Sequence, residues 1–157
     1  MHPSLKILEQ EMHELLPASF AGAEFPPKCF LSMGARFVEY ESRTSLTVCV
    51  PVLEASLNPL QNMQGGFVTA ALDNTFGPLS YLAAGKPCVT LDITTQYVRP
   101  VKSGDELTIK ATVVSRGRSS LYMTAQAFNK KGKLIATAGS NAIILAGSTA
   151  GTERERK

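Results

Sequence analysis

The feature that most constrains this chain is a long helical pattern whose residues are apolar on almost every side. It covers residues 66–84, and Gly85 supplies a natural stop. Its polar exceptions are Asp73 and Asn74, and Pro78 is expected to kink it. A helix that is apolar nearly all round must be buried on nearly all sides. The rest of the chain therefore has to surround this helix.

The segments on both sides of the helix alternate apolar and polar residues, which is the period of a β-strand. Two strands are expected between residues 35 and 52, with a turn at Glu41-Ser42-Arg43. The remaining strands follow the helix and are joined by short turns that contain glycine. They cover residues 87–98, 105–115, 119–129 and 133–146.

One helix cannot bury its whole surface against a flat sheet, but a strongly curved antiparallel sheet can wrap around it. Such a sheet leaves an edge strand, which invites pairing with another subunit. The order of two strands, one apolar helix and four strands therefore predicts an α+β hotdog fold. It also predicts a homodimer.

The two ends of the chain read differently from this central unit. Residues 4–16 have the spacing of a short amphipathic helix, which Pro17 is expected to end, and a linker continues to residue 27. Residues 148–157 are small or charged, as in a disordered tail. The hotdog domain is therefore expected over residues 28–147.

Composition sets limits on location and partners. The chain has 157 residues, of which 44% are hydrophobic, and this suits one domain with one core. No apolar run reaches the ~20 residues of a membrane-spanning helix, and charged residues interrupt the N-terminal segment, so neither a secretory signal nor a membrane partner is expected. A cytoplasmic location is expected instead. The net charge of +3 is scattered, whereas a nucleic-acid binder normally carries a denser basic stripe.

The cysteines and histidines suggest neither a disulfide framework nor a metal site. Cys29, Cys49 and Cys88 are widely spaced and odd in number, so they are expected to be buried or half-buried apolar side chains. His2 and His13 both lie in the leading segment, away from any cluster of ligands. No metal and no cofactor are expected.

The run from Asn58 to Gly66 carries the clearest chemistry. Two glycines at a helix start present backbone N–H groups without intrahelical partners, and these donors can stabilise an oxyanion. Asp73 lies roughly 11 Å further along the helix, too far to serve the same carbonyl, so a symmetric neighbour has to contribute its own Asp73. The plain structural alternative is that Gly65-Gly66 is only a tight helix entry and Asp73 only a hydrogen bonder at an interface.

This run resembles the PaaI-like (phenylacetate-degradation) branch of the hotdog acyl-CoA thioesterases. That branch carries Asn-Pro-x-Gly-x-x-His-Gly-Gly and an acidic residue nine positions after the histidine. Asn58-Pro59, Gly65-Gly66 and Asp73 match this pattern, and Tyr97-Val98-Arg99-Pro100 with Gly104-Asp105 matches a later strand and turn. The resemblance covers roughly residues 28–146. This chain departs from it at Gln64, in place of the histidine, and at Gln61, in place of the first glycine.

The resemblance implies hydrolysis of an acyl-CoA thioester by a homodimer or a dimer of dimers, and it assigns roles by position. The Gly65 N–H would polarise the thioester carbonyl, and Asp73 of the partner subunit would be the general base or the nucleophile. Asn58 would hold the carbonyl or the attacking water. Thr90 would orient that water, although it also fits as an ordinary strand residue. Gln64 can orient a group but cannot carry a proton near neutral pH.

Binding of the substrate needs further residues. Met63 and Gly66 are expected to contact the acyl-CoA, although Met63 also fits a plain core position. The CoA phosphates need positive side chains and close backbone donors, which the turn Arg116-Gly117-Arg118-Ser119-Ser120 offers, with Arg99 and Lys102 next. For any single one of these residues, a solvated turn position is an equal reading.

Three functions are thus compared on one fold. The leading one is a thioesterase for a small or medium acyl-CoA, aromatic acyl groups included. The second is a catalytically silent acyl-CoA binding or sensing protein, which Gln64 suggests. The third is a hydratase or dehydratase, whose chemistry commonly needs a histidine beside a carboxylate, and neither His2 nor His13 lies in the expected core.

Overall fold

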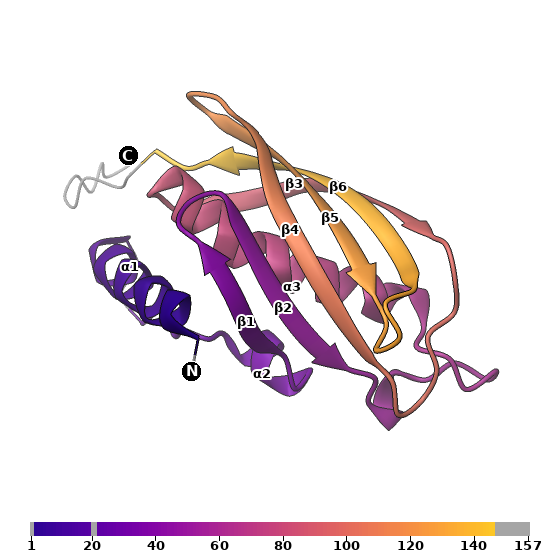
Figure 1. Ribbon diagram of the computed structural model, residues 1–157. Helices are drawn as coiled ribbons and strands as arrows, with labels where there is room; N and C mark the ends of the chain where they lie inside the picture. Colours follow the sequence, from indigo (N-terminus) through magenta and orange to yellow (C-terminus); the bar gives the residue numbers. More distant parts are fainter. Residues whose placement is uncertain (1, 20–21, 147–157) are drawn as a thin grey trace, which may run out of the picture.

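The computed structural model describes residues 2–19 and 22–146, and in this part of the chain an antiparallel sheet curves around α3 (Gly65–Ala84) (Figure 1). The six strands have the spatial order β1-β2-β4-β5-β6-β3. They are β1 Arg36–Glu41, β2 Ser45–Pro51, β3 Cys88–Tyr97, β4 Glu106–Arg116, β5 Ser120–Phe128 and β6 Leu134–Ile144. The hotdog arrangement predicted from the sequence is confirmed, and residues 148–157 lie outside the described residues.

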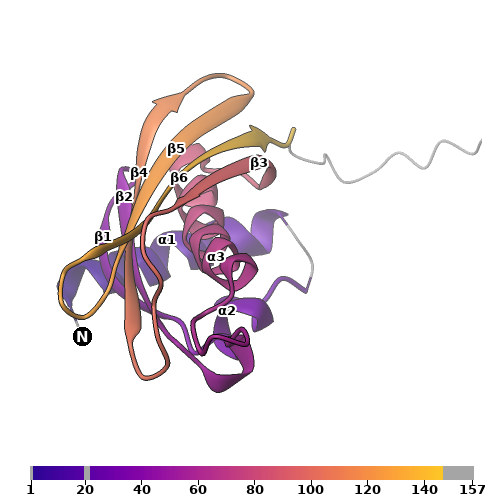
Figure 2. The ribbon, with the colours of Figure 1, turned by 90° about the vertical axis from the view of Figure 1, so that its right-hand side faces the viewer.

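The central helix lies along the concave side of the sheet (Figure 2). Leu72, Phe76 and Leu79 are at most 1% exposed, so the apolar surface of α3 is removed from water, as expected. The helix continues through Pro78, because a proline fixes φ near the helical value. It ends at Gly85, whose φ of 64° suits glycine and whose N–H donates to the Tyr81 carbonyl.

Strand β3 is an edge of the sheet and pairs with β6 alone among the described strands. A β-bulge between Thr90 and Asp92 shifts the register. It places Thr90 toward α3, whereas Asp92 accepts hydrogen bonds from the Asn141 side chain on the outer face. Thr90 and Asp92 therefore lie on opposite faces, although plain alternation would put both on the same face, because a bulge inserts one residue and reverses the alternation.

The leading helix α1 (Pro3–Ser19) packs beside β1 and approaches α3 (Figure 1). It buries Leu8 and Met12. Its carboxylate Glu11 accepts hydrogen bonds of 2.6 Å from the hydroxyls of Tyr40 and Ser42. The expected stop at Pro17 is wrong, because this proline falls in the last turn, where it removes one hydrogen bond while keeping a helical φ.

Two short elements were not expected from the sequence. They are α2 (Lys28–Ser32) and the 3-10 helix η1 (Glu54–Ser56), and both are too short to show a hydrophobic period. Phe30 of α2 is buried and stacks on Phe37 of β1, with ring centroids 4.4 Å apart. The segment before β1 is thus packed against the sheet.

Candidate active site

The entrance of α3 presents two backbone donors to solvent. Gln64 is the N-cap residue, and its carbonyl accepts the N–H groups of Phe67 and Val68. The N–H groups of Gly65 and Gly66 precede the first intrahelical hydrogen bond, and neither finds an acceptor among the described residues. The two amides add to the positive end of the helix dipole, so this entrance can hold an oxyanion.

Tyr97 of β3 holds this entrance in place, a role that the sequence analysis missed. Its hydroxyl donates to the Gly65 carbonyl over 2.9 Å and shares a 2.6 Å hydrogen bond with the Thr69 hydroxyl. A Cβ atom at Gly65 would lie 3.2 Å from the Tyr97 ring, so glycine permits the close approach. The only sequence signal was the place of Tyr97 in the family-like Tyr-Val-Arg-Pro run.

The loop before α3 is organised by the Asn58 side chain. Its Oδ1 accepts the backbone N–H groups of Leu60 and Asn62, at 2.9 and 3.1 Å, and this leaves only the side-chain NH₂ group to donate to a ligand. Gln61 adopts a left-handed conformation with φ of 61°. The family-like pattern has glycine at this position, and the positive φ gives the physical reason. The loop path is therefore compatible with Gln61, at a conformational cost.

Asp73 and Thr90 are brought together by the packing of β3 on α3. The Thr90 hydroxyl donates to the Asp73 carboxylate over 3.1 Å, and both residues are exposed. Eight residues of helix, about 12 Å, separate Asp73 from Gly65. Within one chain the Asp73 carboxylate and the free amides of Gly65 and Gly66 are thus too far apart to contact the same small group.

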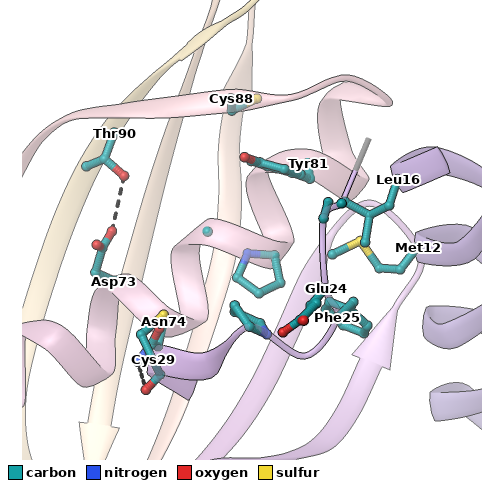
Figure 3. Close-up of a pocket in the computed structure, with 15 residues that line it drawn as sticks. Met12, Leu16, Glu24, Phe25, Cys29, Asp73, Asn74, Tyr81, Cys88 and Thr90 are labelled. Carbon is teal, nitrogen blue, oxygen red and sulfur yellow. Dashed lines mark hydrogen bonds between the residues drawn. The ribbon is translucent and has the colours of Figure 1, made fainter. Parts of the chain in front are cut away.

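An apolar cavity of about 560 Å³ opens beside the Asp73–Thr90 pair (Figure 3). Its walls come from α3, α1 and the segment from Gly22 to Cys29. Burial raises the pKa values of Tyr81 and Cys88, which line it, so both side chains stay neutral near pH 7. The cavity is of the size that proteins use for small ligands.

The basic residues expected to hold phosphates lie near opposite ends of α3. Arg116 donates to the Ala84 carbonyl at the C-terminal end of α3, far from Gly65. Arg118, Ser119 and Ser120 are exposed in the same turn. By contrast, Lys102 forms a β-bridge with Asn62, next to the entrance of α3.

Of the two remaining substrate-binding residues, Gly66 is exposed at the helix entrance. Met63 is 5% exposed and lines a cavity of about 100 Å³ together with Phe67 and Met33. Its backbone N–H donates to the Val101 carbonyl, so Met63 is anchored in the core as well as beside a small opening.

The cysteines match the sequence expectation in part. Cys49 and Cys88 are buried and free, and burial raises the pKa of both thiols, which keeps them protonated. Cys29 is exposed instead: it lines the cavity beside Asp73, and its thiol donates to the Asn74 side chain of α3. Over residues 2–19 and 22–146, no cluster of metal ligands is found, and no helix is both long and apolar enough to cross a bilayer.

Comparison with known proteins shows which proteins part of this chain resembles. The model of the thioesterase superfamily matches residues 60–136. Over 88 residues the chain is 32% identical to acyl-coenzyme A thioesterase 13 of Mus musculus, which is 54% of this chain and 62% of the mouse protein. The chain thus spans less than two thirds of that relative's length.

Solved structures agree with the fold described above. The E. coli PaaI protein superposes with a TM-score of 0.77 at 21% identity, covering 92% of this chain and 97% of that protein. A putative thioesterase from Ralstonia eutropha, related to phenylacetic acid degradation, gives a TM-score of 0.70 at 28% identity, covering 78% and 94%. Over residues 60–136 this chain is similar in sequence to the thioesterase superfamily, and it has the hotdog fold, with PaaI proteins among its structural neighbours.

Proposed function

We propose that this chain is an acyl-CoA thioesterase that works as a symmetric homodimer. The observation that carries the proposal is the exposed Asp73 carboxylate, held by Thr90 at the mouth of an apolar cavity. The activity named for the mouse relative points to the same reaction. The proposed reaction uses no cofactor, since coenzyme A is part of the substrate.

The Asp73 carboxylate and the Gly65 amide can act on one carbonyl only if a partner subunit supplies one of them. The edge strand β3 is the surface that would bind this partner. Leu91 is 60% exposed and Tyr97 is 56% exposed on this unpaired edge. An unpaired edge with apolar side chains is a template for another strand. A second copy of β3, antiparallel to the first, would continue the sheet and shield both side chains.

The register of this pairing follows from which residues have to meet. The helix entrance lies beside Tyr97, and Asp73 lies beside Thr90. Directly opposite residues of antiparallel strands share a face. A two-fold axis at Thr94 brings the helix entrance and Asp73 together, because it sets Leu91, the neighbour of Thr90, opposite the partner's Tyr97. The partner's Gly65 then lies next to this chain's Asp73.

The chemistry of the completed site would proceed from the carboxylate. Asp73 takes a proton from a water that Thr90 orients, and the water oxygen attacks the thioester carbonyl. The partner's Gly65 N–H holds the tetrahedral oxyanion, and the partner's Asn58 side-chain NH₂ is a second donor. The C–S bond then breaks, and the CoA thiolate takes up the proton, giving the free acid and CoA. Direct attack by Asp73, followed by hydrolysis of the resulting anhydride, is the alternative course.

Gln64 is compatible with this mechanism because no step of it transfers a proton to or from residue 64. Its side chain lies against Gly66, with Oε1 2.8 Å from the position of a Cβ atom there, so the amide is close to the entering carbonyl. Arg118, Ser119 and Ser120 remain the proposed contacts for the CoA phosphates, because the Arg116 guanidinium already donates to Ala84. The cytoplasmic location and the dimer-of-dimers assembly stay predictions.

The test is thiol release from a panel of acyl-CoA substrates, followed with a thiol reagent. Asp73→Asn keeps the side-chain shape and is expected to lose about 10²- to 10⁴-fold in rate. Asp92→Asn is the matched control, because this carboxylate lies on the outer face, hydrogen-bonded to Asn141, and its removal should leave the rate unchanged. Release no faster than in buffer for every acyl group, or an Asp73→Asn variant equal to wild type, contradicts the proposal. Tight acyl-CoA binding without turnover identifies the silent binder instead.

A further inference from the structure

The cavity beside Asp73 extends well past the reacting groups. Asp73 and Thr90 lie at one end, and Met12 and Leu16 of α1 lie at the other (Figure 3). The leading helix, which the sequence places outside the hotdog unit, thus supplies the far wall of a cavity that starts at the proposed catalytic carboxylate.

Gly77 lies between these two ends. It follows Asp73 by four residues, so both lie on the same side of α3, and it lines the cavity. A Cβ atom at Gly77 would meet no other atom within 4 Å. Since its neighbours leave this space empty, the missing side chain at Gly77 keeps the passage open from Asp73 toward α1.

The lining identifies the chemistry of an occupant. Phe25, Pro27 and Pro78 present apolar surface, and Tyr81 stays neutral because burial raises its pKa. Apart from Asp73, the lining carboxylate is Glu24, whose side chain is 65% exposed and lies 4.0 Å from the Lys28 ammonium. The interior of the cavity therefore suits an uncharged apolar chain.

We infer that this cavity holds the acyl chain of the thioester and that Gly77 sets how long that chain can be. The inference rests on the proposed function for the identity of the ligand. The carbonyl carbon stays beside Asp73, and the acyl chain runs past Gly77 to Met12 and Leu16. This makes Gly77 and the α1 wall the determinants of acyl-chain length.

The test compares Gly77→Leu, Gly77→Ala and Leu16→Ala on straight-chain substrates from acetyl-CoA to dodecanoyl-CoA. Leucine at Gly77 should lower kcat/KM at least about tenfold more for the longest acyl chain that wild type accepts than for acetyl-CoA. Alanine should give an intermediate loss. Leu16→Ala opens the far wall and should extend the accepted length.

Folding is controlled separately. Leucine and alanine both favour a helix over glycine, so the thermal midpoints of the Gly77 variants should equal or exceed that of wild type. Ile7→Ala is the matched control for Leu16→Ala, because Ile7 is exposed on the same helix and does not line the cavity. Its chain-length profile should follow wild type.

The outcomes separate this inference from the proposed function. If wild type hydrolyses acyl-CoA and the Gly77→Leu profile runs parallel to it, the length role is wrong and the thioesterase stands. If wild type hydrolyses nothing, calorimetry with decanoate and dodecanoate decides. If wild type binds these acids and Gly77→Leu does not, the acyl cavity stands although the thioesterase activity fails. If wild type does not bind them, or if Gly77→Leu binds them equally well, the inference is overturned.

Discussion

The hydroxyl of Thr90 on β3 donates a hydrogen bond to the carboxylate of Asp73 on α3, with 3.1 Å between the two oxygens. The two residues are 17 positions apart in the sequence, and only the packing of the edge strand on the helix joins them. This hydrogen bond occupies one carboxylate oxygen, and the other has no hydrogen-bond partner among the described residues, so it is available as a general base.

Removal of this hydrogen bond should lower turnover while the fold survives. Thr90→Val keeps the side-chain shape, and a hydrogen bond to a charged group is worth about 1.5–3 kcal/mol, so kcat should fall roughly 10- to 100-fold. Thr90→Ser retains the hydroxyl and should recover most of the rate. Steady-state thiol release measures both variants. If serine and valine are equally impaired, the hydroxyl has no positioning role.

Tyr97 should affect turnover through the helix entrance. Tyr97→Phe removes the hydroxyl that holds the Gly65 carbonyl. We expect kcat to fall about tenfold with little change in KM, because the Gly65 N–H that is then displaced stabilises the transition state and not the bound substrate. Tyr122→Phe is the control, because Tyr122 lies on the outer face of the sheet, over Gly139. A change confined to KM would assign Tyr97 to substrate binding instead.

A cysteine at Thr94 tests the two-fold axis directly. Pairing centred on Thr94 brings its two copies face to face, so Thr94→Cys should form an intermolecular disulfide under mild oxidation, visible on non-reducing gels. Gln96→Cys lies on the same strand and face, but its copies would be roughly 14 Å apart along the strand, and it should not cross-link. Cross-linking of Gln96→Cys alone would move the axis, and cross-linking of neither variant would argue against the β3 interface.

Gln61 should carry a conformational cost that glycine removes. Its φ of 61° is unfavourable for a residue with a Cβ atom, so Gln61→Gly should raise the free energy of unfolding by about 1 kcal/mol. Leu60→Gly, in the same loop without a positive φ, should give no such gain. Urea unfolding measures both variants, and an equal effect of the two would refute the strain.

The attachment of α1 should weaken at alkaline pH. Burial and the hydrogen bond to Glu11 raise the pKa of Tyr40 from its ordinary value of 10.0 to about 12. The protonated phenol therefore favours the folded state fully below pH 10, and this contribution is lost as the pH rises from 10 to 12. Tyr40→Phe cannot ionise, and at pH 8 it should cost about 1–2 kcal/mol through the lost hydrogen bonds.

The measurement for Tyr40 is the free energy of unfolding of wild type and Tyr40→Phe across that pH range. The stability gap between the two proteins should shrink between pH 10 and pH 12, because only wild type loses the Tyr40 proton on unfolding there. A gap that stays constant would mean that the Tyr40 phenol titrates normally in the folded protein.

The sequence by itself determined the central helix and the strands around it. Hydrophobic periodicity is a local property, so the sequence predicts a buried helix over residues 66–84 that ends at Gly85. Both ends of this helix agree with α3 to within one residue. Once that helix is known, its apolar surface requires a curved sheet. The run from Asn58 to Gly66 and Asp73 can also be recognised along the chain, but the roles of Asn58, Gly65 and Asp73 rest on the family resemblance and stay predictions.

Tertiary structure decided everything that depends on the relation between two elements. The bulge after Thr90 reverses the alternation of β3, and no period along the sequence marks it. The reach of the Tyr97 hydroxyl to Gly65, and the cavity wall that α1 contributes through Met12, exist only after distant segments pack together. Patterns along a chain determine which faces must be buried, whereas register and packing determine which atoms meet.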